Sequence, residues 1–199
     1  MDRKKFITGT ITAAFSLSAF GKIFENRDGS FKADCKTTND ILGPFYKSGS
    51  PVRSDLTFEG LEGNVIQLEG QVFKSDCITP LHEALVEIWH CNTKGEYDNS
   101  EKGFKHRGSF LTGKDGKYTF KTILPGKYLN GEVYRPSHIH YRVTAKNTSE
   151  LISQIYFKGD PHIEKDPWAS NKKAIHRILP IIPAQINGRL TVKFDIYMG

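Results

Sequence analysis

The stretch of sequence that decides the fold is residues 137–145, SHIHYRVTA. Apolar and polar side chains alternate along it, which is the period of a β-strand. The alternation defines two faces, one with Ile139, Tyr141 and Val143 and the other with His138, His140 and Arg142. The pattern predicts a strand with one face in a hydrophobic core and the other available for chemistry.

Several other short runs support an all-β fold. Apolar residues alternate with polar ones, between turn residues, at 65–73, 84–89, 110–112, 117–123, 151–157 and 190–198. Asp115-Gly116 between two of these runs is typical of a tight turn and predicts a hairpin. Residues 166–178 are expected to form a short helix or a long loop. We expect an antiparallel β-sandwich with long loops and an extended N-terminal arm.

Three regions differ in composition. Residues 1–21 have basic residues at 3–5 ahead of an uncharged, mildly apolar stretch, which is the layout of an export signal; the alternative is an amphipathic or disordered tail. Serine and threonine dilute this stretch, so no stable membrane span is expected. Residues 22–60 are expected to form the extended arm. Residues 61–199 are expected to form one sandwich domain, since a chain of this length suits a single domain. We therefore expect an exported protein, periplasmic or extracellular.

Charge gives little support for nucleic-acid binding. The chain has 28 Lys and Arg against 22 Asp and Glu, a net charge of +6, but the basic residues are scattered among acidic ones. The positive field serves an anionic small molecule equally well.

The three cysteines, Cys35, Cys77 and Cys91, form no C-x-x-C motif. In an exported chain, one disulfide and one leftover thiol would be expected. Cys77 and Cys91 flank the 81–89 segment and are our first choice for the pair. Free buried thiols are an equal alternative.

The two histidines of the decisive strand suggest a metal site. Residues two apart on a strand lie ~6.6 Å apart and point the same way, so His138 and His140 can approach one ion, although two solvated polar residues would show the same spacing. The best further donors are Tyr97 and Tyr128. A phenol has a pKa near ~10, so phenolate ligands at neutral pH require a strongly Lewis-acidic ion such as Fe(III).

An ordered set of motifs resembles the intradiol ring-cleavage dioxygenases, and within them the protocatechuate 3,4-dioxygenase branch. The resemblance runs from residue 43 over most of the chain. The motifs are GPFY at 43–46, W at 89 with Y at 97, DGKYTF at 115–120, LPGKY at 124–128, RPSHIH at 135–140, LISQ at 151–154, YFKGDP at 156–161 and FDI at 194–196.

The resemblance implies a set of roles. Tyr97, Tyr128, His138 and His140 would bind non-haem Fe(III), and Tyr128 would leave the metal and accept a substrate proton. A catechol-type substrate would be cleaved by O₂ between its hydroxylated carbons, giving a muconate-type dicarboxylate that contains both oxygen atoms. Arg135 would stabilise the electron-rich ring carbon. Gln154 would be a third catalytic residue beside Tyr128 and Arg135, and it would orient Arg135 or the substrate.

The sequence also departs from the family pattern. The segment between Tyr128 and His138 is shorter than in protocatechuate dioxygenases, and Asn130 stands where the family has a pocket tryptophan. The identity of the catechol is therefore open. We expect the helical N-terminal domain of catechol and hydroxyquinol enzymes to be absent. Family enzymes assemble, which implies a homo-oligomer, but no interface is identifiable from the sequence.

Two other interpretations remain open. A non-catalytic carboxypeptidase-regulatory-like or transthyretin-like binding module would share the Asp115-Gly116 turn and the Pro125-Gly126 turn. It would not require two tyrosines and an H-x-H strand. A site with Zn or Cu on His138 and His140, without O₂ chemistry, is the second alternative.

Overall fold

The computed structural model describes residues 23–25, 31–33, 35–183 and 189–199. The chain divides into two compact units, Met1–Asp34 and Cys35–Gly199. In the first unit, β1 (Ile23–Glu25) pairs antiparallel with β2 (Phe31–Ala33). The export signal expected at residues 1–21 lies outside the described residues.

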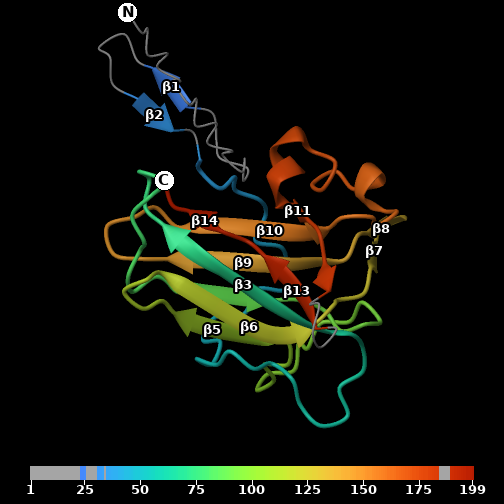
Figure 1. The fold of residues 1–199 in the computed structure, drawn as a ribbon. Coiled ribbons are helices and arrows are strands. Elements are labelled where there is room, and N and C mark those ends of the chain that lie inside the picture. Colours follow the sequence, from blue (N-terminus) through green and yellow to red (C-terminus); the bar gives the residue numbers. More distant parts are fainter. Residues whose placement is uncertain (1–22, 26–30, 34, 184–188) are drawn as a thin grey trace, which may run out of the picture. The chain divides into compact units, whose positions relative to one another are not determined.

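The second unit contains two five-stranded sheets (Figure 1). The first has the order β11-β10-β9-β4-β5, with the bounds Ile178–Leu179, Leu151–Phe157, His138–Thr144, Leu85–Trp89 and Arg107–Leu111. The second has β3 (Val65–Phe73) between β6 (Lys117–Ile123) on one side and β13 (Leu190–Lys193) and β14 (Ile196–Tyr197) on the other; β12 (Ile182–Pro183) pairs with β13. A hairpin of β7 (Tyr128–Asn130) and β8 (Val133–Arg135) projects beside them.

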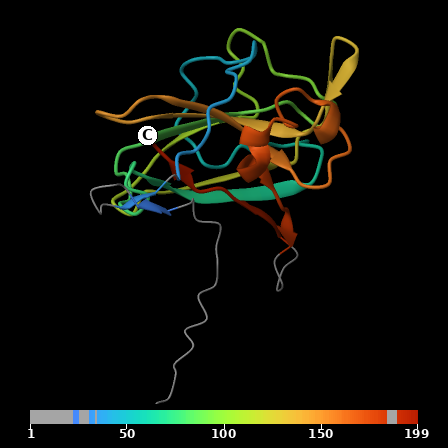
Figure 2. The same ribbon diagram turned by 90° about the horizontal axis from the view of Figure 1, so that it is seen from above.

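The β-sandwich predicted from the alternating runs is confirmed. Figure 2 shows the two sheets as separate layers. Most pairs are antiparallel, but β13 and β14 pair with β3 in parallel, as does β11 with β10. Residues 166–178 contain a short 3-10 helix, η2 (Lys172–Arg177), which follows another, η1 (Ile163–Lys165).

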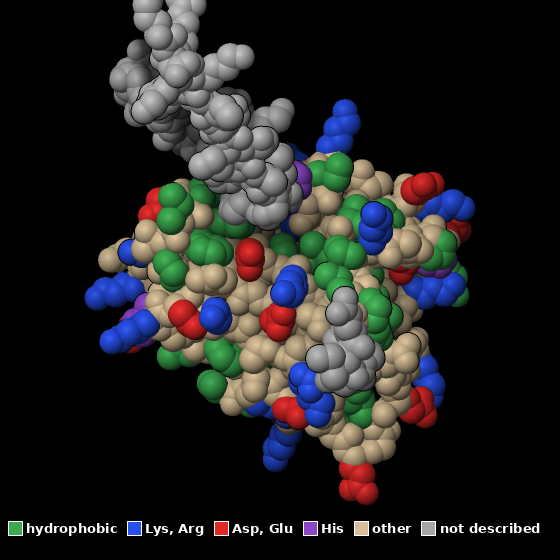
Figure 3. Space-filling view, in the orientation of Figure 1, with side chains coloured by type: hydrophobic (Ala, Val, Ile, Leu, Met, Phe, Trp, Pro, Cys, Tyr) green, Lys and Arg blue, Asp and Glu red, His purple; other side chains and the backbone are tan. Residues whose placement is uncertain are grey.

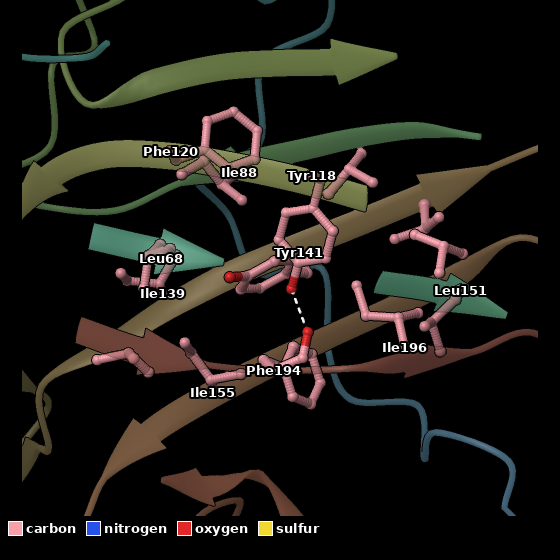
Figure 4. Close-up of a cluster of buried hydrophobic side chains, with 14 of the residues drawn as sticks. Leu68, Ile88, Tyr118, Phe120, Ile139, Tyr141, Leu151, Ile155, Phe194 and Ile196 are labelled. Atoms are coloured by element: carbon pink, nitrogen blue, oxygen red, sulfur yellow. Dashed lines mark hydrogen bonds between the residues drawn. The ribbon is translucent and has the colours of Figure 1, made fainter. Parts of the chain in front are cut away.

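Strand β9 forms as its alternation predicted. Ile139, Tyr141 and Val143 are fully buried and belong to the hydrophobic cluster between the sheets. Figure 4 shows Ile139 and Tyr141 among side chains from both layers, including Leu68 and Phe120 of the facing sheet. The opposite side chains of β9 therefore point to the outer face of the first sheet.

The prediction of a hairpin at Asp115-Gly116 is wrong. A tight turn does form there, and Gly116 has φ +68, but β5 pairs with β4 and β6 pairs with β3. The chain thus crosses from one sheet to the other at this turn. A residue with positive φ produces the turn whether or not the flanking strands pair, so local sequence does not identify their partners.

The arm residues from 35 onward follow the strands of the sandwich. Asp40 N donates to Ile152 O at 2.8 Å in β10, and Arg53 N donates to Ser109 O at 3.0 Å in β5. Because backbone hydrogen bonds fix these contacts, this part of the arm is ordered along the edges of β10 and β5 in the first sheet.

The first choice for the disulfide, Cys77 with Cys91, is also wrong. Cys35 pairs with Cys77, with Cα atoms 6.0 Å apart, and Cys91 is a buried free cysteine. Cys77 precedes β4 and Cys91 follows it, so the extended strand of about 17 Å keeps them apart. A disulfide requires Cα atoms within about 7 Å.

The surface charges are interspersed. Figure 3 shows basic and acidic side chains next to one another on the face of the second sheet, where Lys193 pairs with Glu69 and Lys121 with Asp55. This arrangement agrees with the absence of a basic block in the sequence. In the part of the chain that the structure describes, no helix has the length and hydropathy to cross a membrane.

A buried histidine connects the two sheets. His90, just after β4, donates from Nδ1 to Cys91 O and accepts at Nε2 from Thr122 Oγ1 of β6, both at 2.7 Å. Burial, followed by the proximity of His106, lowers the pKa of His90 to about 3. The ring is therefore neutral in the folded protein over the physiological range.

We expect this histidine to make folding sensitive to acid. In the unfolded chain a histidine takes up a proton near pH ~6.5, while folded His90 stays neutral down to about 3. Its contribution to stability is thus complete above pH ~6.5 and is lost as the pH falls, by about 1.4 kcal/mol per pH unit. The gap in urea unfolding free energy between wild type and His90→Gln should shrink by about 2.5 kcal/mol between pH 6 and pH 4. A gap independent of pH would contradict the assignment.

Candidate metal centre

His138 and His140 lie on the outer face of the first sheet, yet both are almost completely buried, at 0% and 1% exposure. Their ring centroids are 5.0 Å apart. The covering comes from the arm and from the loops that follow β4 and β6. A strand face that would otherwise be solvated is thereby enclosed.

The hydrogen bonding of His138 fixes which nitrogen is available. Nδ1 lies 2.6 Å from Pro136 O, and since a carbonyl only accepts, Nδ1 carries the proton. Nε2 therefore has a free lone pair, and Tyr97 Oη lies 3.5 Å from it. Burial, with the nearby charge of Arg135 as the next cause, lowers the pKa of His138 to about 3. A neutral imidazole with one nitrogen held is the form in which histidine binds metals.

His140 is held by packing alone. Its ring stacks on Trp89, with centroids 4.8 Å apart and planes 9° apart, and both ring nitrogens are buried without a hydrogen-bond partner among the described residues. Burial holds the pKa of His140 well below its ordinary value. A buried polar group without a partner costs about 1–3 kcal/mol, so this ring is arranged for a ligand that the polypeptide does not supply.

The two tyrosines come from loops and complete a cluster of four rings. Tyr97 follows β4 after a turn at Gly95, and Tyr128 begins β7. The Tyr97 and Tyr128 centroids are 5.8 Å apart, Tyr128 is 5.5 Å from His138, and Tyr97 is 6.4 Å from His140. Phe45 of the arm stacks on Tyr97 at 4.2 Å. The structure thus brings together all four side chains singled out in the sequence.

The chemistry of these donors fits an ion of high charge. Burial raises the pKa of Tyr97 well above its ordinary value, so its phenol keeps its proton unless a strongly Lewis-acidic ion replaces it. Among the described residues, no group of three or more His, Cys, Asp and Glu side chains could hold a metal. The candidate set of four donors therefore consists of two imidazoles and two phenols.

Arg135 lies at the end of β8, beside the four rings, and is buried. Nε donates to Asp166 Oδ2 at 2.9 Å, and Nη2 donates to Gln154 Oε1 at 3.0 Å. Its guanidinium lies 4.4 Å from the ring centroid of Trp168 and 6.0 Å from that of Tyr128. Burial is the largest single influence and acts to lower the pKa of Arg135, but the hydrogen bond and charge of Asp166, together with Tyr128 and Tyr156, outweigh it and raise the pKa. A fixed positive charge therefore borders the candidate site.

Some residues at this site were missed in the sequence. Asp166 is the buried acid that pairs with Arg135, and Trp168 covers the guanidinium. A buried arginine requires an acidic partner, but the sequence does not indicate which of the 22 acidic residues supplies it. Trp89, the tryptophan of one of the family motifs, packs on His140 and also contacts Tyr46 of the arm.

Residues 41–197 match the family model described as dioxygenase, and this match covers more than half of the chain. The chain therefore belongs to the intradiol ring-cleavage dioxygenase family. A protein named catechol 1,2-dioxygenase 2 from Acinetobacter lwoffii is 35% identical over 153 residues, which cover 65% of this chain and 54% of that protein. A hydroxyquinol 1,2-dioxygenase from Rhizobium sp. (strain MTP-10005) is 30% identical over 156 residues, 68% of this chain and 52% of that protein. The chain spans about half the length of these curated relatives.

Solved structures agree. The dioxygenase domain of a dioxygenase and carbohydrate-binding protein fusion from Streptomyces sp. SirexAA-E has a TM-score of 0.71 and 31% identity, over 81% of this chain and 97% of that one. Catechol 1,2-dioxygenase from Acinetobacter sp. ADP1 has a TM-score of 0.70 and 29% identity, over 81% of this chain and 62% of that one. The sandwich and its family are therefore shown by independent comparisons.

A substitution at Gly43 would test whether the arm sets the position of the His140 ring. It has φ +74, and a Cβ there would lie 3.0 Å from His140 Cε1. Gly49 has φ +78 and open space around it. Alanine at either position should lower the free energy of unfolding by about 1 kcal/mol through backbone strain. Only Gly43→Ala should displace the His140 ring, and we expect it to weaken metal binding at this candidate site about tenfold in competition titrations with a chelator.

Gly49→Ala is the matched control, since it carries the same backbone strain without a neighbour. Equal metal affinities for Gly43→Ala and Gly49→Ala would show that the arm does not set the position of His140.

Proposed function

We propose that this protein is a non-haem Fe(III) dioxygenase that cleaves a catechol-type substrate with O₂ between its two hydroxylated carbons. The observation that carries the proposal is the cluster of Tyr97, Tyr128, His138 and His140, in which both nitrogens of His140 are buried without a partner. Membership of the intradiol family supports it. The product would be a muconate-type dicarboxylate that contains both atoms of O₂.

Each side chain has a distinct part in this reaction. The four rings would hold Fe(III). When bound, this ion would supply a Lewis-acidic centre that a catecholate can chelate, and it would make the catecholate ring reactive toward O₂. Tyr128 is only partly buried and begins the exposed β7–β8 hairpin, and its oxygen would take a proton from a substrate hydroxyl. Arg135 keeps its charge through Asp166 and would stabilise negative charge on the ring carbon that reacts. Gln154 would hold Arg135 in place.

Relatives support the substrate class but leave the particular substrate open. The relatives reported above are named for catechol and hydroxyquinol. Asn130, exposed on β7, stands where the resembling branch has a pocket tryptophan. Oxygen uptake by the iron-loaded protein with plain, carboxylated and hydroxylated catechols would identify the substrate.

Three variants test the assigned site. Tyr128→Phe and His140→Ala should each lose most ring-cleavage activity, and His140→Ala should also lose iron and the visible absorption of a tyrosinate–Fe(III) site. Arg135→Leu should keep iron and lower kcat. Tyr134→Phe is the control, because Tyr134 is 43% exposed on the same hairpin and contacts Lys127 and His162 instead of the four rings.

Full turnover by Tyr128→Phe or His140→Ala would refute the site. Bound Zn or Cu without visible tyrosinate absorption would favour the metal site without O₂ chemistry. A colourless, metal-free protein that binds no catechol would favour a binding module.

We further propose that the protein is exported. The layout of residues 1–21 and the Cys35–Cys77 disulfide support an oxidising compartment. In cells fractionated under thiol-blocking conditions, the protein should appear outside the cytoplasm with one reactive cysteine after unfolding. Three reactive cysteines in a cytoplasmic fraction would contradict this proposal.

A further inference from the structure

The guanidinium of Arg135 is held by three oxygens from the surrounding strands and loops. Asp166 accepts from Nε, while Nη2 donates to Gln154 Oε1 at 3.0 Å and faces Tyr156 Oη at 3.5 Å. Gln154 and Tyr156 are neighbours on the same face of β10. Each of these side chains can donate a hydrogen bond as well as accept one. A further contact must therefore orient each oxygen toward Arg135.

The arm provides the groups that orient Gln154 and Tyr156. Gln154 Nε2 donates to Ile41 O at 2.9 Å, which leaves Oε1 for the guanidinium. Tyr156 Oη donates to Asp40 Oδ2 at 3.0 Å, which leaves an oxygen lone pair for Nη2. The two acceptors of Arg135 are therefore oriented by two consecutive residues of a segment more than a hundred positions earlier in the chain.

The carboxylate of Asp40 is enclosed by donors. Its side chain is 3% exposed and pairs with Arg177 Nη1 at 2.6 Å. Ile41 N donates to Oδ1 at 2.7 Å, and Gln154 Nε2 lies 3.5 Å from the same oxygen. Arg177 also donates to Gln154 O at 2.7 Å, so the pair holds β10 as well. An environment composed of donors accepts a carboxylate and disfavours an amide, whose NH₂ group would face other hydrogens.

The loss of this carboxylate has a definite consequence. Tyr156 Oη lies 3.4 Å from Gln154 Oε1, which is the nearest other acceptor. Without Asp40, the Tyr156 hydroxyl would donate to that oxygen and compete with Arg135 for it. Hydrogen bonds in such buried networks depend on one another, so one change at the arm reaches the guanidinium.

We propose that Asp40 is a positioning residue for Arg135, acting through Tyr156 and Gln154. The inference rests on the proposed function, in which Arg135 stabilises charge on the reacting substrate. Asp40 lies one residue before the segment that matches the family model, so the match itself assigns it nothing.

The first test compares two variants that change the same chemical group. Asp40→Asn keeps the shape of the side chain but faces the donors with NH₂, and it should lower kcat about tenfold with KM and iron content unchanged. Asp55→Asn is the matched control, because Asp55 belongs to the same arm and pairs with Lys121 at 3.1 Å on the surface. It should leave kcat unchanged. Tyr156→Phe removes the intervening hydroxyl and should lower kcat in the same direction.

A double-mutant cycle separates positioning from a loss of packing. In an Arg135→Leu background the guanidinium is gone, so Asp40→Asn should cause no further loss of kcat. If the two losses multiply instead, Asp40 acts independently of Arg135 and the inference is wrong. It is equally wrong if Asp40→Asn has the kcat of wild type.

A second readout needs neither iron nor turnover. In nitrogen-15 spectra of the metal-free protein, the Nη groups of Arg135 should rotate slowly in wild type and in Asp55→Asn, and at least several-fold faster in Asp40→Asn. Equal rotation rates in all three proteins would overturn the inference. If iron-loaded wild type consumes no O₂ with any catechol, the proposed function fails, while these spectra still decide whether Asp40 holds Arg135.

Discussion

The structure depends on the burial of two neutral imidazoles on the outer face of a sheet. His138 has one nitrogen held by Pro136 O, and His140 has neither held. Water would satisfy such groups on an open strand, but here the arm and two loops exclude it. The cost of that exclusion is about 1–3 kcal/mol for an unpaired polar group, and a ligand bound to His140 would offset it.

The outer face of the first sheet is organised around this constraint. Trp89, next to His140 in the sheet, supplies a flat surface for the ring, and Phe45 does the same for Tyr97. The inner face of β9 is in the core, so the strand is anchored on both sides and its histidines have little freedom. Rigid strands hold such donors more accurately than loops do. Tyr97 comes from a loop and Tyr128 from the start of β7, and both are only partly buried.

Much of the scaffold was predictable from local pattern. Strands β3 and β10 begin and end where alternation predicted, and the H-x-H strand has the predicted faces. Local pattern failed where partners are chosen over long distances. The turn at Asp115-Gly116 formed without a hairpin, and Cys77 paired with a cysteine of the arm. The four ring donors were recognisable by residue type and motif. Asp166 was not, because an acid that pairs across space leaves no periodic signal.

The arm is synthesised early, but its partners are synthesised late. Thr37 N donates to Tyr197 O, and Asp40 pairs with Arg177, so residues near the start of the domain are held by residues near its end. The ring donors, in contrast, all lie between residues 97 and 140. During translation the donors would therefore emerge before the segments that anchor their cover. Closure of the site is thus a late step of assembly, available only to a chain whose last strands are complete.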